Sequence, residues 1–336
     1  MPDLQTASPA SADLAELAVV RRSGLIESRH FGSLVALDSS GAAVLELGAT
    51  DQVILPRSTV KPLQALACLT AGAPLSGEEL AIASGSHTGQ DEHLRVVDSI
   101  LDRAGLDRHA LGCPVDRPED EATFEAMLRS GETRNTARMN CSGKHAAMLL
   151  ACAVNGWSTT DYLSADHPLQ KHIEQTMAEL TGVAVTHVAV DGCGAPLFGT
   201  TVRGVAAAFR SLVTAPPEEP AWVVAEAMRA HPFYVGGSGQ ANTELMRSLP
   251  GVLAKGGAEG VIGVAAPDGS SVSMKIIDGS PRATTLIALH VLEFLGTPIE
   301  GAHALKDLPV LGGAARVGEI DAGHDLSEAI TAGGDA

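Results

Sequence analysis

The chain has 336 residues and a formal net charge of −17. This acidic balance argues against nucleic-acid binding, which depends on cationic contacts with phosphate, and against binding to anionic membrane surfaces. No apolar run reaches the length of a membrane span, and the N-terminus lacks the basic and apolar regions of a signal peptide, so we expect a cytoplasmic protein. The five cysteines, an odd number, are expected to be thiols.

The N-terminal part of the chain predicts a tail and then strands. Residues 1–15 are rich in Ala, Ser, Pro and Asp, so we expect a flexible tail there. Residues 33–37 and 42–47 flank residues 38–41 (DSSG), which favour a hairpin turn. Residues 63–69 are typical of a buried helix.

Helical patterns fill the middle of the chain, with apolar residues at helical spacing. They cover residues 91–104, 121–131, 146–154, 168–181, 200–212 and 221–230. The stretch 146–154 is apolar on all sides, which is typical of a central buried helix.

Towards the C-terminus the pattern returns to strands. Residues 252–265 predict a strand, a glycine loop and a second strand, residues 271–277 add a strand, and residues 282–295 predict an apolar helix. Residues 313–336 are rich in Gly and Asp and are expected to form a mobile tail. This order predicts an α/β (α+β) protein with a single domain over residues 16–312. One antiparallel sheet, built from both chain ends, would have helices on its faces and a helical middle.

The stretch from Arg57 to Pro62 carries the first chemical signal. If a helix begins near Ser58, Lys61 lies on the same face within reach of the serine hydroxyl, and Pro62 fits in the first turn. A serine is a weak nucleophile until a base takes its proton, and a lysine can be that base when burial lowers its pKa. Ser-x-x-Lys is the arrangement of penicillin-recognising acyl enzymes. Taken alone, these residues favour the simpler interpretation of a serine helix cap and a surface lysine.

Five polar stretches interrupt apolar surroundings at the ends of predicted elements. They are residues 57–61, 84–89, 140–145, 191–196 and 255–257. Polar residues at the ends of several elements indicate a site assembled on a rigid scaffold. No glycine-rich phosphate loop follows a predicted strand, so a nucleotide cofactor is not expected.

These stretches contain five motifs, in chain order. They are PRSTVKP (56–62), SHTG (86–89), NCSGKH (140–145), DGCGAP (191–196) and AKGGAEG (254–260). Together they resemble the rhizobial-type L-asparaginases, also called the asparaginase II or class 3 family, and the resemblance runs from about Val19 to about Gly312. It implies a serine β-lactamase-like fold, a homodimer, and hydrolysis of L-asparagine to L-aspartate and ammonia.

The resemblance implies two serine–lysine pairs that act together, Ser58 with Lys61 and Ser86 with Lys255. Ser84 lies in the same loop as Ser86, and Ser86 is preferred because Ser-His-x-Gly fits the family pattern. Our hypothesis is that Ser58 loses its proton through Lys61 and attacks the amide carbon, while Ser86 and Lys255 relay protons or tune the pKa of Lys61. The roles of the two serines could be reversed. The simpler interpretation is a helix-capping hydroxyl at Ser86 and a surface lysine at Lys255.

The resemblance also implies one zinc ion per chain, held by Cys141, Lys144 and Cys193. Thiolates are good zinc ligands, and a lysine binds metal only as a neutral amine, so metal affinity should rise with pH. From the residues alone, the simpler interpretation is two buried thiols that act as small apolar side chains.

Four residues of the motifs form the predicted substrate-binding set. Asp191 matches a family residue near the substrate. Arg57 adjoins the expected nucleophile, so it could bind a substrate carboxylate through two hydrogen bonds, or only line the dimer surface. His87 and Gly256, next to Ser86 and Lys255, complete the set.

Other functions remain compatible with the sequence. A glutamine-directed or β-lactam-directed serine hydrolase of the same fold would share Ser-x-x-Lys, and asparagine differs from glutamine by only one methylene. An inactive zinc-binding regulatory protein would keep the metal and lose hydrolysis. The presence of both serine–lysine pairs argues against this last alternative.

Overall fold

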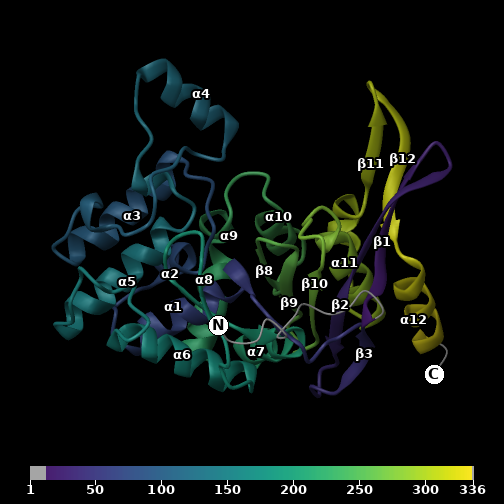
Figure 1. The fold of residues 1–336 in the computed structure, drawn as a ribbon, viewed down its shortest axis with the longest axis horizontal. Helices are drawn as coiled ribbons and strands as arrows, with labels where there is room; N and C mark the ends of the chain where they lie inside the picture. Colours follow the sequence, from purple (N-terminus) through teal and green to yellow (C-terminus); the bar gives the residue numbers. More distant parts are fainter. Residues whose placement is uncertain (1–12, 335–336) are drawn as a thin grey trace, which may run out of the picture.

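The computed structural model describes residues 13–334 of the chain (Figure 1). The tail predicted for residues 1–15 therefore lies outside the described residues, except for its last three. Of these three, Ala15 already belongs to the first strand, β1 (Ala15–Arg22).

One large antiparallel sheet forms one side of the molecule (Figure 1). Its strands run in the order β11-β12-β1-β2-β10-β9-β8, and β3 pairs with β2. Besides β1, the strands are β2 (Leu25–Leu37), β3 (Ala43–Leu47), β8 (Leu253–Gly257), β9 (Val261–Ala265), β10 (Ser271–Ile276), β11 (Leu308–Gly312) and β12 (Ala315–Ala322). The central pair joins β2 from the start of the chain to β10 near its end. The prediction of one antiparallel sheet built from both chain ends is therefore confirmed.

Two short sheets lie outside this large one. The strand β4 (Val53–Ile54) pairs with β7 (Thr200–Thr201), and β5 (Val188–Val190) pairs with β6 (Pro196–Phe198). Both short sheets position polar stretches that the sequence marks as candidate site segments, because β4 leads into residues 57–61 and β5 leads into residues 191–196.

The helices fill the rest of the molecule, mostly on the side away from β11 and β12 (Figure 1). They are α1 (Lys61–Thr70), α2 (Gly77–Ala83), α3 (Asp91–Arg103), α4 (Glu121–Ser130), α5 (Ser142–Asn155), α6 (Pro168–Thr181), α7 (Val202–Thr214), α8 (Pro220–Ala230), α9 (Pro232–Val235), α10 (Ala241–Ser248), α11 (Thr284–Phe294) and α12 (His324–Gly334). The helix α5 is buried on all sides from Ser142 to Cys152 and contacts α1, α2, α3 and α6. This is the central buried helix that the apolar run 146–154 predicts.

Alternating side chains of β2 pack on the two faces of the sheet. Val35 and Leu37 cluster with Val202 of α7, whereas Leu34 and Ala36 point the other way, into the main core to which α11 also contributes. This alternation follows from the two-residue repeat of a strand. Helices thus pack on both faces of the sheet. Its edge strand β8 carries Lys255, one of the candidate site lysines.

The end of the chain differs from the expected tail over residues 313–336. Residues 315–322 form β12, which pairs with both β1 and β11, and α12 follows and packs on β1. The glycines that suggest flexibility in the sequence permit close approach instead. A Cβ at Gly318 would lie 1.9 Å from the Arg21 carbonyl oxygen, and one at Gly323 would lie 2.3 Å from the Glu16 carbonyl oxygen. The domain prediction of 16–312 is therefore too short at this end.

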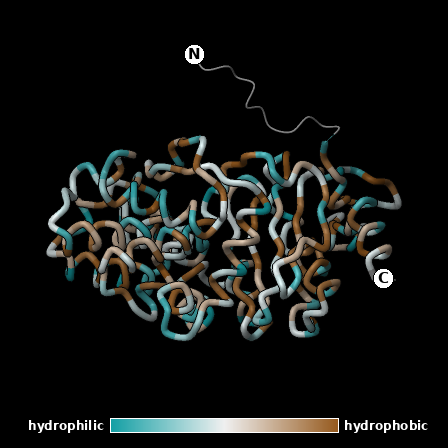
Figure 2. Tube along the Cα trace, turned by 90° about the horizontal axis from the view of Figure 1, so that it is seen from below, coloured by the Kyte–Doolittle hydropathy of each residue, from teal (hydrophilic) through white to brown (hydrophobic). Residues whose placement is uncertain are grey.

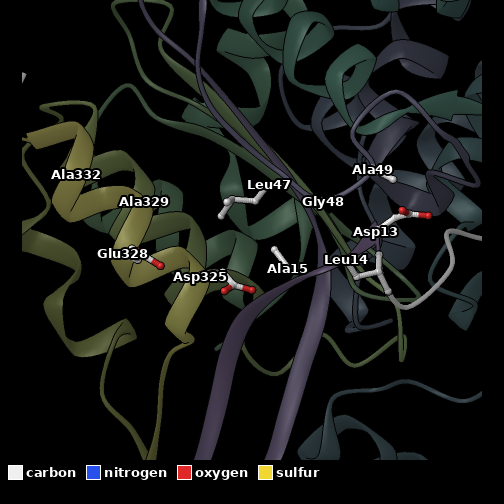
Figure 3. Close-up of a pocket in the computed structure, with 10 residues that line it drawn as sticks. All are labelled: Asp13, Leu14, Ala15, Leu47, Gly48, Ala49, Asp325, Glu328, Ala329 and Ala332. Carbon is white, nitrogen blue, oxygen red and sulfur yellow. The ribbon is translucent and has the colours of Figure 1, made fainter.

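Hydrophobic stretches along the chain are short and interrupted by hydrophilic residues (Figure 2). Within residues 13–334, no helix is both long enough and apolar enough to cross a membrane. An open cavity of about 700 Å³ lies where α12 meets β1 and the end of β3 (Figure 3). None of the predicted site residues lines this cavity.

We expect a chain that ends at Gly312 to lose its cooperative thermal unfolding or to melt at a much lower temperature, because β1 would lose the strand that pairs with its outer edge. Circular dichroism with size-exclusion chromatography, on the shortened and full chains, measures this. As a control, Leu311→Ala changes an exposed side chain of β11 and should shift the melting temperature little. A shortened chain that melts like the full chain would contradict the structural role of β12.

Candidate active site

Two buried lysines meet at one serine hydroxyl. Lys61 Nζ lies 2.9 Å from Ser86 Oγ, and Lys255 Nζ lies 3.0 Å from the same oxygen. Lys61 is 1% exposed and Lys255 is 0% exposed, while Ser86 is half-buried. The hydroxyl thus links the two amines, and the side chain that carries it is less buried than either lysine.

Helix α1 carries Lys61, the loop after α2 carries Ser86, and strand β8 carries Lys255. Lys61 is the first residue of α1, which continues a 3-10 helix over Arg57–Val60, and Pro62 lies in its first turn as the sequence predicts. Ser86 follows α2 in a loop that passes close to other backbone. A Cβ at Gly85 would lie 2.6 Å from the Tyr234 carbonyl oxygen, so only glycine fits there without a shift of the backbone.

Backbone carbonyls supply the remaining partners of the two amines. Lys61 Nζ donates to the Gly85 carbonyl at 2.6 Å and lies 3.4 Å from the Asn140 carbonyl, and Lys255 Nζ donates to the Gly256 carbonyl. Burial lowers the pKa of Lys255 well below its usual value, and the charge of nearby Lys61 lowers that pKa further. The lowered pKa therefore favours the neutral amine form of the Lys255 side chain.

Ser58 lies close to these groups in the chain but is placed differently. Its side chain is half-buried, and within the described part of the chain its hydroxyl forms no hydrogen bond, so the predicted bond between Ser58 and Lys61 is not formed here. The other serine of the loop, Ser84, is buried and donates to the Leu80 carbonyl at 3.0 Å. The structure thus brings Ser86, and not Ser84, to the lysines.

Arg57 is held by two carboxylates at the edge of the site. Its Nε donates to Asp191 Oδ1 at 2.8 Å, and its Nη1 lies 3.8 Å from Glu259 Oε1. Burial raises the pKa of Asp191, but the charges of Lys144 and Arg57 lower that pKa by more, so it lies below its usual value. The predicted neighbours Arg57 and Asp191 are therefore in direct contact.

His87 is buried and does not lie where a substrate could touch it. The Gly89 N–H donates to its Nδ1 at 3.1 Å, so Nε2 carries the hydrogen and donates to Ser142 Oγ at 2.9 Å. Burial lowers the pKa of His87 well below its usual value, and charge on His93 and Lys61 lowers it further. With both ring nitrogens occupied by protein partners, His87 positions the loop of Ser86, and the geometry does not support its predicted contact with substrate.

The three predicted metal ligands converge in the core. Lys144 Nζ lies 3.2 Å from Cys193 Sγ, and Cys193 Sγ lies 3.6 Å from Asp191 Oδ2. Hydrogen bonding with Cys193 lowers the pKa of Cys141 well below its usual value and raises that of Cys193. Burial lowers the pKa of Lys144, but the two sulfurs raise it by more. Two thiols and an amine side by side fit the donor set of a tetrahedral zinc ion with one position left open.

These ligands are not joined by further metal-binding side chains. Among residues 13–334, no group of three or more His, Cys, Asp or Glu side chains is arranged to hold a metal ion. A metal at Cys141 and Cys193 would therefore need the amine of Lys144 as its third protein ligand. That is the set the motifs predict.

Three residues at the site carry no assigned role in the sequence prediction. Asn140 Nδ2 donates to Glu119 Oε1 at 2.8 Å, beside the Asn140 carbonyl that faces Lys61. The half-buried Gly256 donates its N–H to Asn242 Oδ1 at 2.7 Å. Asn140 begins a recognised motif and could have been selected from the sequence. Glu119 and Asn242 lie in a loop and a helix whose patterns give no sign of their neighbours in space.

Comparison of the chain with known proteins identifies one matching family. A family model described as L-asparaginase II matches residues 18–322. No curated protein matches the chain.

Similar solved structures include one titled "Crystal Structure Analysis of Mglu", 14% identical, covering 80% of this chain and 68% of that chain, with a TM-score of 0.45. Mglu in its glutamate form is 15% identical over 80% of this chain and 61% of that one, with a TM-score of 0.47. A β-lactamase from Mycobacterium bovis is 15% identical over 80% of this chain and 95% of its own, with a TM-score of 0.43. The chain thus spans about two thirds of the length of Mglu.

The lowered pKa of Lys255 predicts a stability effect that depends on pH. An unfolded lysine binds a proton below about pH 10.4, whereas the folded chain binds fewer protons at Lys255 in the window between its lowered pKa and that value. The free energy of unfolding of the wild type therefore rises with pH across this window. Because methionine does not titrate, Lys255→Met should compare more favourably with the wild type at pH 7 than at pH 10.

Urea unfolding at both pH values measures this difference. As a control, Lys171→Met removes a lysine from the exposed side of α6, and its stability difference from the wild type should be the same at both pH values. An equal difference for Lys255→Met at pH 7 and pH 10 would show that Lys255 is charged in the folded protein.

Proposed function

Because the chain belongs to the L-asparaginase II family, we propose that it hydrolyses the side-chain amide of L-asparagine to L-aspartate and ammonia. Family membership indicates an amidohydrolase in general. The observation that carries the specific proposal is the contact of two buried lysines, Lys61 and Lys255, with the Ser86 hydroxyl. The half-buried Ser58 lies three residues before Lys61 in the sequence. These groups can supply a nucleophile, a base and a route for protons at one place.

In this proposal Ser58 is the nucleophile. Its hydroxyl has no protein partner among the described residues, it is half-buried, and it lies three residues before the buried amine of Lys61. Ser58 Oγ forms a bond to the amide carbon as its proton passes to a lysine amine. That proton is then delivered to the leaving nitrogen, the C–N bond breaks and ammonia departs. Water hydrolyses the ester, which restores the serine and gives the carboxylic acid of aspartate.

Ser86 connects the two amines that handle these protons. Burial and the charge of Lys61 disfavour a second ammonium at Lys255, so one of the two amines is suited to accept a proton while the other holds one. The hydroxyl of Ser86, at hydrogen-bond distance from both, can pass a proton between them. This supports the role of proton relay for Ser86 and Lys255.

The reverse assignment is favoured by one specific observation. Both lysines contact Ser86 and neither contacts Ser58, so Ser86 is the serine whose hydroxyl already has a base within hydrogen-bond distance. In that case Ser86 would form the ester and Ser58 would assist. The site of the covalent intermediate distinguishes the two assignments.

We also propose that Cys141, Lys144 and Cys193 hold one zinc ion. The contact of Lys144 Nζ with Cys193 Sγ at 3.2 Å, and the lowered pKa of Cys141, which favours a thiolate ligand, support this proposal. When bound, zinc would supply a Lewis acid or fix the position of the substrate. Without metal, the amine and the two sulfurs stabilise one another as a charged cluster.

A homodimer in the cytoplasm completes the proposal. The homodimer rests on the family motifs, and the exposed apolar side chains of Val188 and Val190 on β5, next to Asp191, offer a surface for such a contact. The cytoplasmic location rests on the sequence alone.

We expect ammonia release from L-asparagine by the wild type, little release from L-glutamine, and a loss on the order of 10³-fold or more in Ser58→Ala, which lacks the nucleophile. Acid quenching during turnover, followed by peptide mass spectrometry, should locate the aspartyl ester on Ser58. As a control, Ser84→Ala removes a buried hydroxyl outside the site and should remain active.

An ester on Ser86 would support the reverse assignment. Ammonia release only from glutamine, or ring opening of a β-lactam without ammonia release from asparagine, would replace the proposed substrate. A zinc-loaded protein inert towards all three would support a regulatory role.

We expect about one equivalent of zinc per chain by elemental analysis, and less than about a tenth in the double variant Cys141→Ser/Cys193→Ser, because both sulfur ligands are removed. A chelator should also lower the melting temperature of the wild type but not that of the double variant. Cys68→Ala, which removes a buried thiol of α1, is the control and should retain the metal. Equal zinc content in the double variant would place the metal elsewhere.

A further inference from the structure

Three carboxylates surround the site, and they differ in how fully they are engaged. Asp191 accepts from Arg57 Nε at 2.8 Å, and Glu119 accepts from Asn140 Nδ2 at 2.8 Å. Among residues 13–334, the one ion pair of Glu259 is a long contact of 3.8 Å with Arg57 Nη1, and its side chain is 61% exposed. Glu259 is therefore the carboxylate with the most hydrogen-bonding capacity left for a ligand.

The backbone at both ends of this long contact is unusual. Arg57 has a φ of 52° and Glu259 a φ of 61°, in the left-handed region that residues other than glycine seldom adopt. Within residues 13–334, the other non-glycine residues with positive φ are Ser23 and Glu218. Backbone of this kind persists only where its surroundings hold it, and it is concentrated at ligand-binding positions.

The surroundings that hold Glu259 are visible. Lys275 Nζ donates to the Glu259 carbonyl at 2.7 Å, which fixes the turn between β8 and β9. The side chain of Glu259 packs over Gly279, where a Cβ would lie 2.5 Å from Glu259 Oε2. Its position is therefore built by the fold, although most of its carboxylate is open to solvent.

The same turn packs against the 3-10 helix that carries Ser58. A Cβ at Gly257 would lie 2.7 Å from Thr59 Oγ1 and 2.9 Å from the Thr59 nitrogen, so this glycine allows β8 and the 3-10 helix to touch. Arg57 and Ser58 are consecutive on that helix. The turn that carries Glu259 therefore packs directly against the 3-10 helix that carries Arg57 and Ser58.

We propose that Arg57 and Glu259 form a clamp for the two charged groups of an α-amino acid, in which Arg57 binds the α-carboxylate and Glu259 binds the α-ammonium. This inference rests on the proposed function and names the feature that selects free amino acids over simple amides. Asp191 fixes the guanidinium through Nε and leaves its other N–H groups for a carboxylate. The long contact between Arg57 and Glu259 opens without loss of a short hydrogen bond, so the ligand can enter between them.

The test compares L-asparagine with succinamic acid, which has the same amide and carboxylate but lacks the α-ammonium. In Glu259→Gln, the ratio of kcat/KM for L-asparagine to kcat/KM for succinamic acid should fall by about 10- to 100-fold, as expected for the loss of one charged hydrogen bond. Glu244→Gln on α10, which alters a surface ion pair with Arg247, is the matched control and should keep the wild-type ratio. An unchanged ratio in Glu259→Gln overturns the clamp. A fall of this ratio in Glu119→Gln, with no fall in Glu259→Gln, also overturns the clamp, because the ammonium would then be bound by the Glu119 carboxylate.

A binding measurement separates failure of the clamp from failure of the proposed function. Calorimetry with L-aspartate and with succinate, which lacks the α-ammonium, needs no turnover. If the wild type released no ammonia but bound L-aspartate more tightly than succinate, and Glu259→Gln lost that preference, the clamp would stand and the proposed reaction would fall. If the wild type bound both acids equally, the clamp would be overturned whatever the activity.

Discussion

The burial of two lysine amines against one serine hydroxyl is the constraint on which the rest of the site depends. Lys61 and Lys255 are both almost fully buried, and two ammonium groups so close together in a poorly hydrated site repel each other. The fold meets this demand with the carbonyls of Gly85 and Gly256 and with a lowered pKa at Lys255. Helix α1, the loop after α2 and strand β8 must therefore meet at Ser86, and the large sheet keeps β8 in place.

A third buried lysine shows how surroundings set the charge of the same side chain. Lys144 is as buried as Lys255, but its pKa is raised, because the sulfurs of Cys141 and Cys193 more than offset the effect of burial. Their surroundings thus favour the neutral amine at Lys255 and the charged ammonium at Lys144. Both amines belong to lysines, and their pKa values differ because Lys255 is buried beside the charge of Lys61, whereas Lys144 is buried beside two sulfurs.

The sequence predicts the sheet from both chain ends because most of its strand patterns lie near the two termini. It predicts the site segments because polar residues interrupt apolar elements. It does not predict β12, since Gly318 resembles a flexible position until the Arg21 carbonyl is seen beside it. It does not predict that Lys61 bonds to Ser86, because spacing along a helix describes only local neighbours. For the same reason the motif suggests a substrate contact at His87, although packing with Ser142 and Gly89 buries it. Local sequence patterns predict helices, strands and motifs. Contacts between segments that are distant in the sequence can be identified only from the folded structure.

Asp191 joins Arg57 to the sulfur cluster. Its Oδ1 holds Arg57 at 2.8 Å, its Oδ2 lies 3.6 Å from Cys193 Sγ, and both residues 191 and 193 belong to one turn closed by a bond from the Gly194 N–H to the Asp191 carbonyl. Arg57 depends on such contacts, because its φ of 52° is unfavourable without them. A change in the charge of the sulfur cluster therefore acts on the carboxylate that orients Arg57. The tight spacing Asp-Gly-Cys-Gly places Asp191 two residues from a sulfur of the cluster, so one carboxylate contacts both Arg57 and Cys193.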